Sequence, residues 1–245
     1  MKKYIFRALA VVAAAVAVWF SFYTESLEEH RFLEQKGTFK PEETVDFYWA
    51  NKRGELMEQA MDYPSFVAAL AENPQRLAEE KGRVLGIGSN TFFIVKGSTS
   101  DFRVGEEEIV CRGVTGLSSA SSASSASPVS SASGTSSGLT ATLVTDYIFG
   151  SVARDATGWF SPGDFRTTMD FNNVSAYINQ LIVNEMSELW PSIEAAASLS
   201  SAASLSSATS SESARRLEFC GAVEVDLRHV QTDGLVIIPY MVEIK

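Results

Sequence analysis

A long apolar run opens the chain and limits how its N-terminus can fold. Residues 5–23 form a stretch of 19 residues that contains one charge, Arg7. As a helix rising about 1.5 Å per residue, it would span roughly 28 Å, which is close to the hydrocarbon thickness of a bilayer. Aromatic residues gather at its far end, where a membrane interface would lie. We therefore expect a signal anchor, a single transmembrane helix, over residues 1–24 and a juxtamembrane linker over residues 25–40.

A cleaved signal peptide is the alternative interpretation of this run. Ala15-Val16-Ala17 fits the small-residue pattern of a cleavage site, although the most apolar residues follow it. No Cys follows the run to accept a lipid, because the first Cys is Cys111. Lys2 and Lys3 place the N-terminus in the cytoplasm under the positive-inside rule. In both interpretations the rest of the chain is extracytoplasmic, and with an anchor the domain is held at the cytoplasmic membrane, in the periplasm.

Charge and composition restrict the partners and the chemistry of the exported part. The whole chain carries a net charge of −10; residues 1–40 carry +2, so the remainder carries −12. Nucleic-acid binders present a basic face, so we expect no nucleic-acid partner. Two Cys and two His are too few for a disulfide scaffold or a Cys/His zinc module, and they leave few parts for Cys–His or Ser–His catalysis. The sequence thus predicts no metal, no cofactor and no catalytic residue.

Two Ser/Ala-rich tracts interrupt the exported part. They cover residues 118–138 and 192–214, and neither carries enough apolar surface to offset the entropy of ordering it. We interpret both as insertions in surface loops, with the Ala-rich second tract able to be partly helical. Without the anchor region and the tracts, about 160 residues remain, a usual size for one domain. The predicted domain therefore spans residues 41–245.

The first part of this domain has helical patterns. Val45, Tyr48 and Trp49 have the i, i+3, i+4 spacing of one helical face. A second helix is predicted to begin at residues 62–65. A third begins after Asn73, a suitable N-cap, and Gly82 ends it.

Beyond Gly82 the pattern changes to five predicted strands and one helix. The helix covers about residues 173–190 and is expected to end at Pro191, between the third and fourth strands. Pro239 indicates a sheet edge or a β-bulge in the last strand. This element order predicts an α+β fold, an OB-like five-stranded β-barrel with N-terminal helices. The predicted strands cover residues 91–95, 101–112, 139–149, 217–227 and 235–244.

One block of sequence resembles a known family. The block runs Thr145-Asp146-Tyr147-Ile148-Phe149-Gly150-Ser151-Val152-Ala153-Arg154-Asp155-Ala156, continues through Asp164-Phe165 and ends Met169-Asp170-Phe171-Asn172-Asn173-Val174. Further matching pieces are Phe47-Tyr48-Trp49, Phe92-Phe93-Ile94-Val95-Lys96-Gly97, Phe219-x-Gly221 and Ile237-Ile238-Pro239. Together these pieces resemble the bacterial family of predicted periplasmic lipoproteins, domain of unknown function family 2291.

The resemblance implies an exported, membrane-tethered domain with an OB-like barrel. Members of the family often accompany components of sugar-type ABC transporters, and the resemblance implies no reaction. This chain departs from the family in lacking a lipobox Cys after the apolar run, so the apolar anchor would supply the tether. The two Ser/Ala-rich tracts are also departures.

Arg154 and Asp155 are the first candidate binding residues. They follow an apolar strand and a Gly, and strand ends commonly carry ligand groups. Arginine offers a planar fork for carboxylates, phosphates or sugar hydroxyls. The structural alternative pairs Arg154 with a carboxylate and lets Asp155 accept backbone N–H groups in a turn.

A polar cluster in the same block supplies the other candidates, Asp164, Asp170, Asn172 and Asn173. Their oxygens could coordinate Ca²⁺, but their spacing matches no EF-hand loop. Asp164 and one of the two Asn residues also fit helix N-caps. Cys111 and Cys220 lie on predicted strands, where they either pair in an oxidising compartment or remain buried as free thiols.

These observations favour a non-enzymatic function. We expect an anchored extracytoplasmic accessory or binding protein that recognises a small molecule or a partner near Arg154, linked to ABC transporter components of the sugar type. One alternative is a carboxylate-based hydrolase that uses Asp155 with Asp164 or Asp170, because glycosidase chemistry needs two carboxyls at a defined separation. Another is a structural envelope protein that works through surface contacts.

Overall fold

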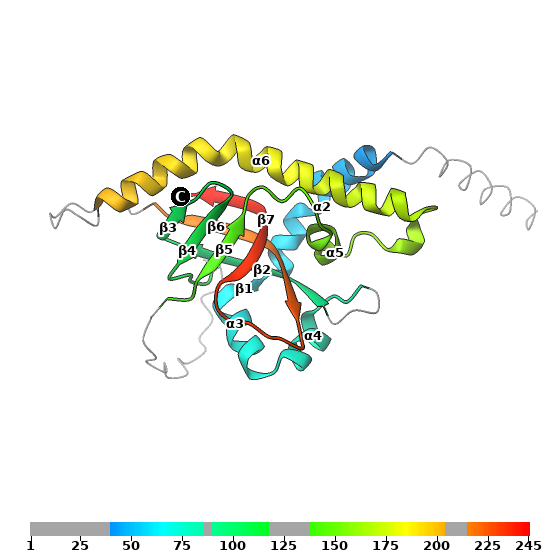
Figure 1. Ribbon diagram of the computed structural model, residues 1–245, viewed down its shortest axis with the longest axis horizontal. Helices are drawn as coiled ribbons and strands as arrows, with labels where there is room; N and C mark the ends of the chain where they lie inside the picture. The colour runs from blue at the N-terminus through cyan, green and yellow to red at the C-terminus, as the bar shows by residue number, and fades with distance from the viewer. Residues whose placement is uncertain (1–39, 86–89, 118–137, 204–214) are drawn as a thin grey trace, which may run out of the picture.

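A single mixed sheet and the helices around it form the fold. The computed structural model describes residues 40–85, 90–117, 138–203 and 215–245. The long helix α6 runs across one side of the sheet beside α2, and α3 and α4 lie at the opposite side (Figure 1). The elements are α2 (Pro41–Gln59), β1 (Met61–Asp62), α3 (Tyr63–Glu72), α4 (Pro74–Lys81), β2 (Asn90–Thr99), β3 (Asp101–Val104), β4 (Glu108–Arg112), β5 (Ala141–Val144), α5 (Val152–Thr157), the 3₁₀ turn η2 (Pro162–Asp164), α6 (Thr168–Ala203), β6 (Leu217–Asp226) and β7 (Leu235–Ile244).

The seven strands lie in the order β1-β2-β6-β7-β5-β4-β3. The pairs β1–β2 and β5–β7 are parallel and the other pairs are antiparallel. The sheet curls enough for Ser98, near the end of β2, to form an antiparallel bridge with Thr115 after β4. Strands β1 and β3 nevertheless remain as edges, so the sheet is open.

The predicted five-stranded barrel is therefore wrong in strand number and in closure. The range 101–112 holds two strands, because Gly105 turns the chain and its N–H donates to the carbonyl of Glu108 at 2.8 Å. Strand β1 has two residues, and its hydrogen-bond partners all come from β2. Two residues are too few to show an alternating pattern in the sequence. The range 139–149 contains only the short strand β5, since the chain is irregular after Thr145.

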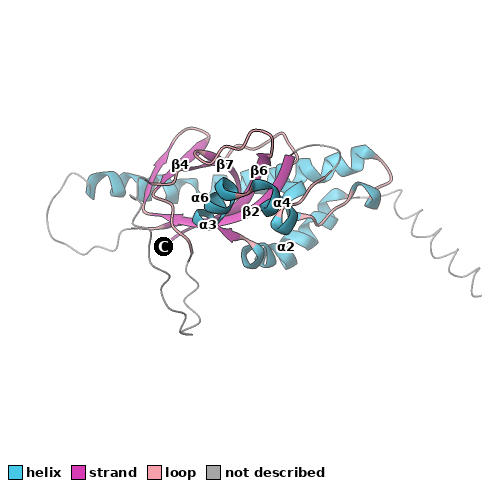
Figure 2. Cartoon of the chain, turned by 90° about the horizontal axis from the view of Figure 1, so that it is seen from below, coloured by secondary structure: helices cyan, strands magenta, loops and turns pink. Residues whose placement is uncertain are grey.

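The central strands are buried on both faces. On one face of the sheet, Phe93 packs on Phe66 of α3, with ring centroids 5.1 Å apart, and Phe219 meets Tyr63 at 6.4 Å. On the other face, α5 packs against β2 and β6 while α6 contacts β3 and β7. Figure 2 looks at the molecule from the side on which α3 and α4 lie. Helices on both faces explain why β2 and β6 are apolar runs rather than alternating ones.

The predicted ends of α4 are confirmed. The side chain of Asn73 accepts a hydrogen bond from the backbone N–H of Arg76 at 3.0 Å, Pro74 occupies the first turn, and Gly82 is the C-cap residue. Local chemistry alone fixes this helix, because a cap, a proline and a glycine each act within one turn.

Helix α6 is longer than predicted and contains Pro191. It begins at Thr168 and continues past the proline into the second Ser/Ala-rich tract, where Ile193 and Ala196 are buried. The indole N–H of Trp190 donates to Glu194 across the proline at 3.0 Å. Proline removes one backbone donor but leaves this packing intact, which explains why the helix does not end there. Residues 118–137 of the other tract lie outside the described residues.

A β-bulge shapes the pairing of β6 with β7. Cys220 pairs with Met241 whereas Gly221 pairs with Pro239, so Tyr240 is the additional residue. Its buried hydroxyl donates to the carbonyl of Ala153 at 2.7 Å, which ties the sheet to α5. The bulge, and not a sheet edge, thus accommodates Pro239, because β7 lies between β6 and β5.

The predicted transmembrane helix over residues 1–24 lies outside the described residues. Among the helices that are described, none is both long and apolar enough to cross a bilayer.

Candidate functional site

The Arg154–Asp155 pair belongs to α5 and lies inside the molecule, where Arg154 contacts Phe171 near the start of α6. Both residues are 5% exposed. The guanidinium donates to Asp155 Oδ1 through Nε and pairs through Nη2, each at 2.7 Å, and Nη1 donates to the carbonyl of Phe171 at 3.0 Å. The guanidinium carbon also stands 3.5 Å from the centre of the Phe171 ring. These contacts match the pairing of Arg154 with a carboxylate in the structural alternative, although the donor to Asp155 is the guanidinium and not a backbone N–H group of a turn.

The other sequence candidates are placed apart from this pair. Asp164 accepts the backbone N–H of Ser161 at 2.8 Å and so closes the turn η2. Asp170 accepts from the hydroxyl of Thr167 at 2.8 Å at the start of α6. Asn172 and Asn173 are exposed residues inside that helix, so their interpretation as N-caps is wrong. A binding role for these residues stays a prediction.

The same contacts bear on the hydrolase hypothesis. A two-carboxylate mechanism needs both groups at the substrate, one of them able to carry a proton. Asp155 is buried against a guanidinium, and Asp164 and Asp170 are engaged by their own turns. This arrangement does not supply a pair of carboxyls facing one substrate.

A partly enclosed cleft of about 330 Å³ lies on the α5 side of the sheet. We call it the Arg83 cleft. Five elements contribute to it, namely the ends of α2 and α4, strands β1 and β2 and helix α5. Its lining residues are Gln59, Met61, Glu80, Lys81, Gly82, Arg83, Phe92, Phe93, Ile94 and Ala156.

Arg83 is the residue that gives this cleft its chemistry. Its backbone forms a bridge with Phe92 through two hydrogen bonds of 2.9 and 2.8 Å. Its Nη2 donates to Gln59 Oε1 at 3.3 Å, and its guanidinium covers Gly158, where an added Cβ would overlap it. Within the described residues no carboxylate lies within 4.0 Å of this guanidinium. The cleft therefore offers a positioned cation to a ligand.

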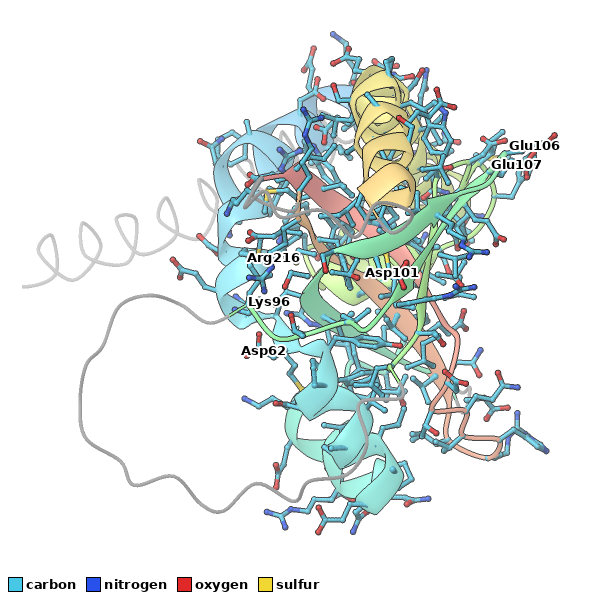
Figure 3. All side chains as sticks on the ribbon, turned by 90° about the vertical axis from the view of Figure 1, so that its left-hand side faces the viewer. Asp62, Lys96, Asp101, Glu106, Glu107 and Arg216 are labelled. Carbon is cyan, nitrogen blue, oxygen red and sulfur yellow. The ribbon has the colours of Figure 1, made fainter. Side chains whose placement is uncertain are left out.

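A second cleft, of about 360 Å³ and more open, lies between α6 and the ends of β4 and β5. Trp190, Met186 and Val183 form an apolar wall on α6. Glu106, Glu107 and Asp146 line the other side, and Figure 3 shows the two Glu residues at the outer end of the β3–β4 turn. This cleft suits a cationic group and repels anions. Among the described residues no three His, Cys, Asp or Glu side chains are close enough to hold a metal ion.

A third group of charges lies on the opposite side of the view in Figure 3, where Asp62, Lys96 and Arg216 are labelled. Asp62 accepts the N–H of Leu117 at 3.0 Å, and Lys96 donates to the carbonyl of Met57 at 3.0 Å. Arg216 donates to the hydroxyls of Ser98 and Thr115. Each charge is used to join segments of the fold.

The two thiols are free and buried, Cys111 in β4 and Cys220 in β6. Burial raises the pKa of each to about 12. Because the thiolate is the nucleophile, these thiols are poor nucleophiles near neutral pH.

We expect both thiols to resist an aromatic disulfide reagent at pH 8 until the protein unfolds. A rise in pKa from 9.0 to about 12 lowers the thiolate fraction by about a thousand-fold. Between those values the folded state also binds more protons than the unfolded state, so stability falls as the pH rises. Absorbance during labelling, with and without urea, checks this. Rapid labelling of the native protein would contradict the buried placement.

Sequence reasoning did not identify Arg83, Gln59 or Gly158 as site residues. One signal was available, since Arg83 follows the helix-ending Gly82 and precedes a strand in a strongly acidic domain. The partners of Arg83 come from distant positions, and their proximity has no local signature.

Comparisons with known proteins agree on a family and a fold. The family model described as predicted periplasmic lipoprotein, domain of unknown function family 2291, matches residues 12–243. A crystal structure of an OB-fold protein from Thermotoga maritima MSB8 is similar with a TM-score of 0.54 and 18% sequence identity, over 84% of this chain and 99% of that one. Curated proteins gave no match. The structural likeness supports an OB-related fold.

Proposed function

Because the chain belongs to the predicted periplasmic lipoprotein family, domain of unknown function family 2291, we propose that it is an extracytoplasmic, membrane-associated accessory protein that acts by binding. The family description supports the compartment. The acidic charge of the exported part suits a soluble domain that does not adhere to anionic lipid headgroups.

The Arg83 cleft is the observation that carries the binding proposal. Small-molecule sites are concave and mostly apolar, with a few placed polar groups, and most measure about 300–1,000 Å³. The cleft has a volume of about 330 Å³ and one positioned guanidinium above a few nearly buried apolar residues, and its lining is more polar than that of most such sites. It favours recognition over the purely structural alternative, for which a sheet without a cleft would be expected.

A link to a sugar-type ABC transporter is the second part of the proposal, with the N-terminal apolar segment as the tether. An exposed loop supports contact with a partner. Phe149 is 88% exposed and Ile148 is 53% exposed, although both belong to the family-like block. Asn179 holds this loop by donating to the carbonyls of Ile148 and Gly150 at 3.2 and 3.0 Å. Such a fixed apolar tip is costly to leave in water unless something covers it.

In-cell photo-crosslinking tests the transporter link. A photoreactive phenylalanine replaces Phe149 in the full chain, and the matched control carries it at Val236, an exposed residue of β7. We expect membranes from the first strain, and not the second, to yield a sugar-type permease or its binding protein. Equal recovery at both positions, or equal sugar uptake with and without the protein, would remove this part of the proposal.

A further inference from the structure

The Arg83 guanidinium is preorganised to bind a planar anion. Its backbone is fixed to β2, and Gln59 and Gly158 position the fork from two other elements. Gly158 has φ of +61°, the left-handed region that favours glycine, so the chain keeps a residue without a side chain where the guanidinium lies. A preorganised fork loses less freedom on binding than a mobile side chain does.

The charges around the cleft favour a single negative charge on the ligand. Lys81 adds a second cation at the rim. Glu80 is the one acidic lining residue, and Arg76 pairs with its carboxylate at 2.7 Å. The site is therefore cationic in a chain with a net charge of −10.

The rest of the cleft is small, and more of its accessible lining is polar than apolar. Phe92 and Ile94 of β2 and Ala156 of α5 line its floor but are at most 8% exposed, so they present only narrow apolar surfaces, and Met61 lies beside them. A volume of about 330 Å³ is at the small end of the range of ligand sites, so the cleft suits a small ligand.

We infer that the Arg83 cleft binds a small organic carboxylate, with its carboxylate on the fork of Arg83 and its remaining atoms beside Phe92 and Ile94. This inference rests on the proposed binding function and names the ligand class. Arginine and a carboxylate match in a two-bond geometry that a neutral amide cannot supply.

Titration calorimetry of the full chain in detergent micelles tests the ligand class. The probes are benzoate and hexanoate, each with its neutral amide, and inorganic phosphate. We expect each carboxylate to bind at least ten-fold more tightly than its amide and to shift the methyl resonances of Ile94 in an NMR spectrum. Equal affinities for acid and amide, or tighter binding of phosphate than of both acids, would overturn the inference.

Variants of single residues test whether Arg83 is responsible for the binding of carboxylates. Replacing it by glutamine should weaken carboxylate binding by about 10- to 100-fold, the value of a charge-assisted hydrogen bond. Gly158→Ala keeps every charge and displaces the guanidinium, so it should also weaken binding. Arg103→Gln removes one charge from the exposed side of β3, at the far edge of the sheet, and should change little. Loss of affinity in the Arg103 variant equal to that in the Arg83 variant would mean a general charge effect, and would overturn the inference.

The outcomes separate the ligand class from the proposed function. If neutral fragments from a small-molecule library shift the methyl resonances of Ile94 and no carboxylate binds more tightly than its amide, the cleft is a binding site for another class of ligand. If no small molecule shifts these resonances, both the carboxylate inference and the proposed binding function of the cleft are wrong.

Discussion

Replacing Arg154 with methionine is expected to lower the free energy of unfolding by about 3–5 kcal/mol. The change leaves the carboxylate of Asp155 without its guanidinium in a position that is 5% exposed, and it removes the donor to the carbonyl of Phe171. The desolvation of an unpaired charge is the main cost. Urea denaturation of the full chain, followed by tryptophan fluorescence, measures the loss.

Two further variants make this result interpretable. Arg76→Met breaks an ion pair of the same 2.7 Å length on the surface of α4, where water replaces the lost partner, so little change is expected. The double change of Arg154 to methionine and Asp155 to leucine removes both charges and should recover part of the loss. If the double variant is the least stable, the packing of the two side chains, and not their charge, dominates.

Gly221→Ala is expected to destabilise the fold by about 1–3 kcal/mol, the usual cost of overpacking. Gly221 faces the β-bulge of β7, where an added Cβ would press on the backbone carbonyl of Ile238 and lie 2.6 Å from Ile237 Cγ2. Backbone atoms in the middle of a sheet cannot move aside as a flexible side chain can. Urea denaturation measures this change as well, and loss of the Tyr240 contact with Ala153 should accompany it.

The control for this variant is Gly54→Ala, in the exposed interior of α2. Apart from its neighbours in the helix, no atom lies within 4 Å of the added Cβ there, so the change should stabilise the helix by about 0.5–1 kcal/mol. Opposite signs for the two variants would confirm that the contact with β7 decides the effect. A neutral Gly221 variant would show that the bulge adapts to a side chain.

The elements that the sequence predicts well are those set by local chemistry. The cap, proline and glycine of α4 lie within ten residues of each other, and the apolar face of α2 repeats at helical spacing. The predicted number of strands was wrong because strands also depend on contacts between distant residues. Strand β1 exists only because β2, about thirty residues later, provides its hydrogen-bond partners. The turn at Gly105 divides a range whose composition is uniformly suited to strands.

The candidate site also combines residues that stand out locally in the sequence with residues whose role depends on distant contacts. Arg154 and Asp155 stand out in the sequence because they are charges within an apolar block, but that setting also describes a buried ion pair, and the structure places them in the interior. Arg83 is inconspicuous in the sequence. Its importance comes from Gln59, Phe92 and Gly158, which the fold brings to it from three other elements.

Pro191 gives helix α6 two parts that need not open together. A proline cannot donate to the carbonyl four residues before it, so the hydrogen-bond ladder that couples neighbouring turns is broken once, near Ser187. Residues before this point are clamped by Arg53 of α2, which pairs with Glu185 at 2.5 Å, whereas Ile193 and Ala196, after this point, are buried. Hydrogen exchange in the longest helix of the described chain should therefore divide into two units, with the C-terminal one opening at lower free energy. The break in the ladder lies beside the second cleft, whose wall includes Trp190 and Pro191, so local opening of the C-terminal part would change that cleft while the first part of the helix stays folded.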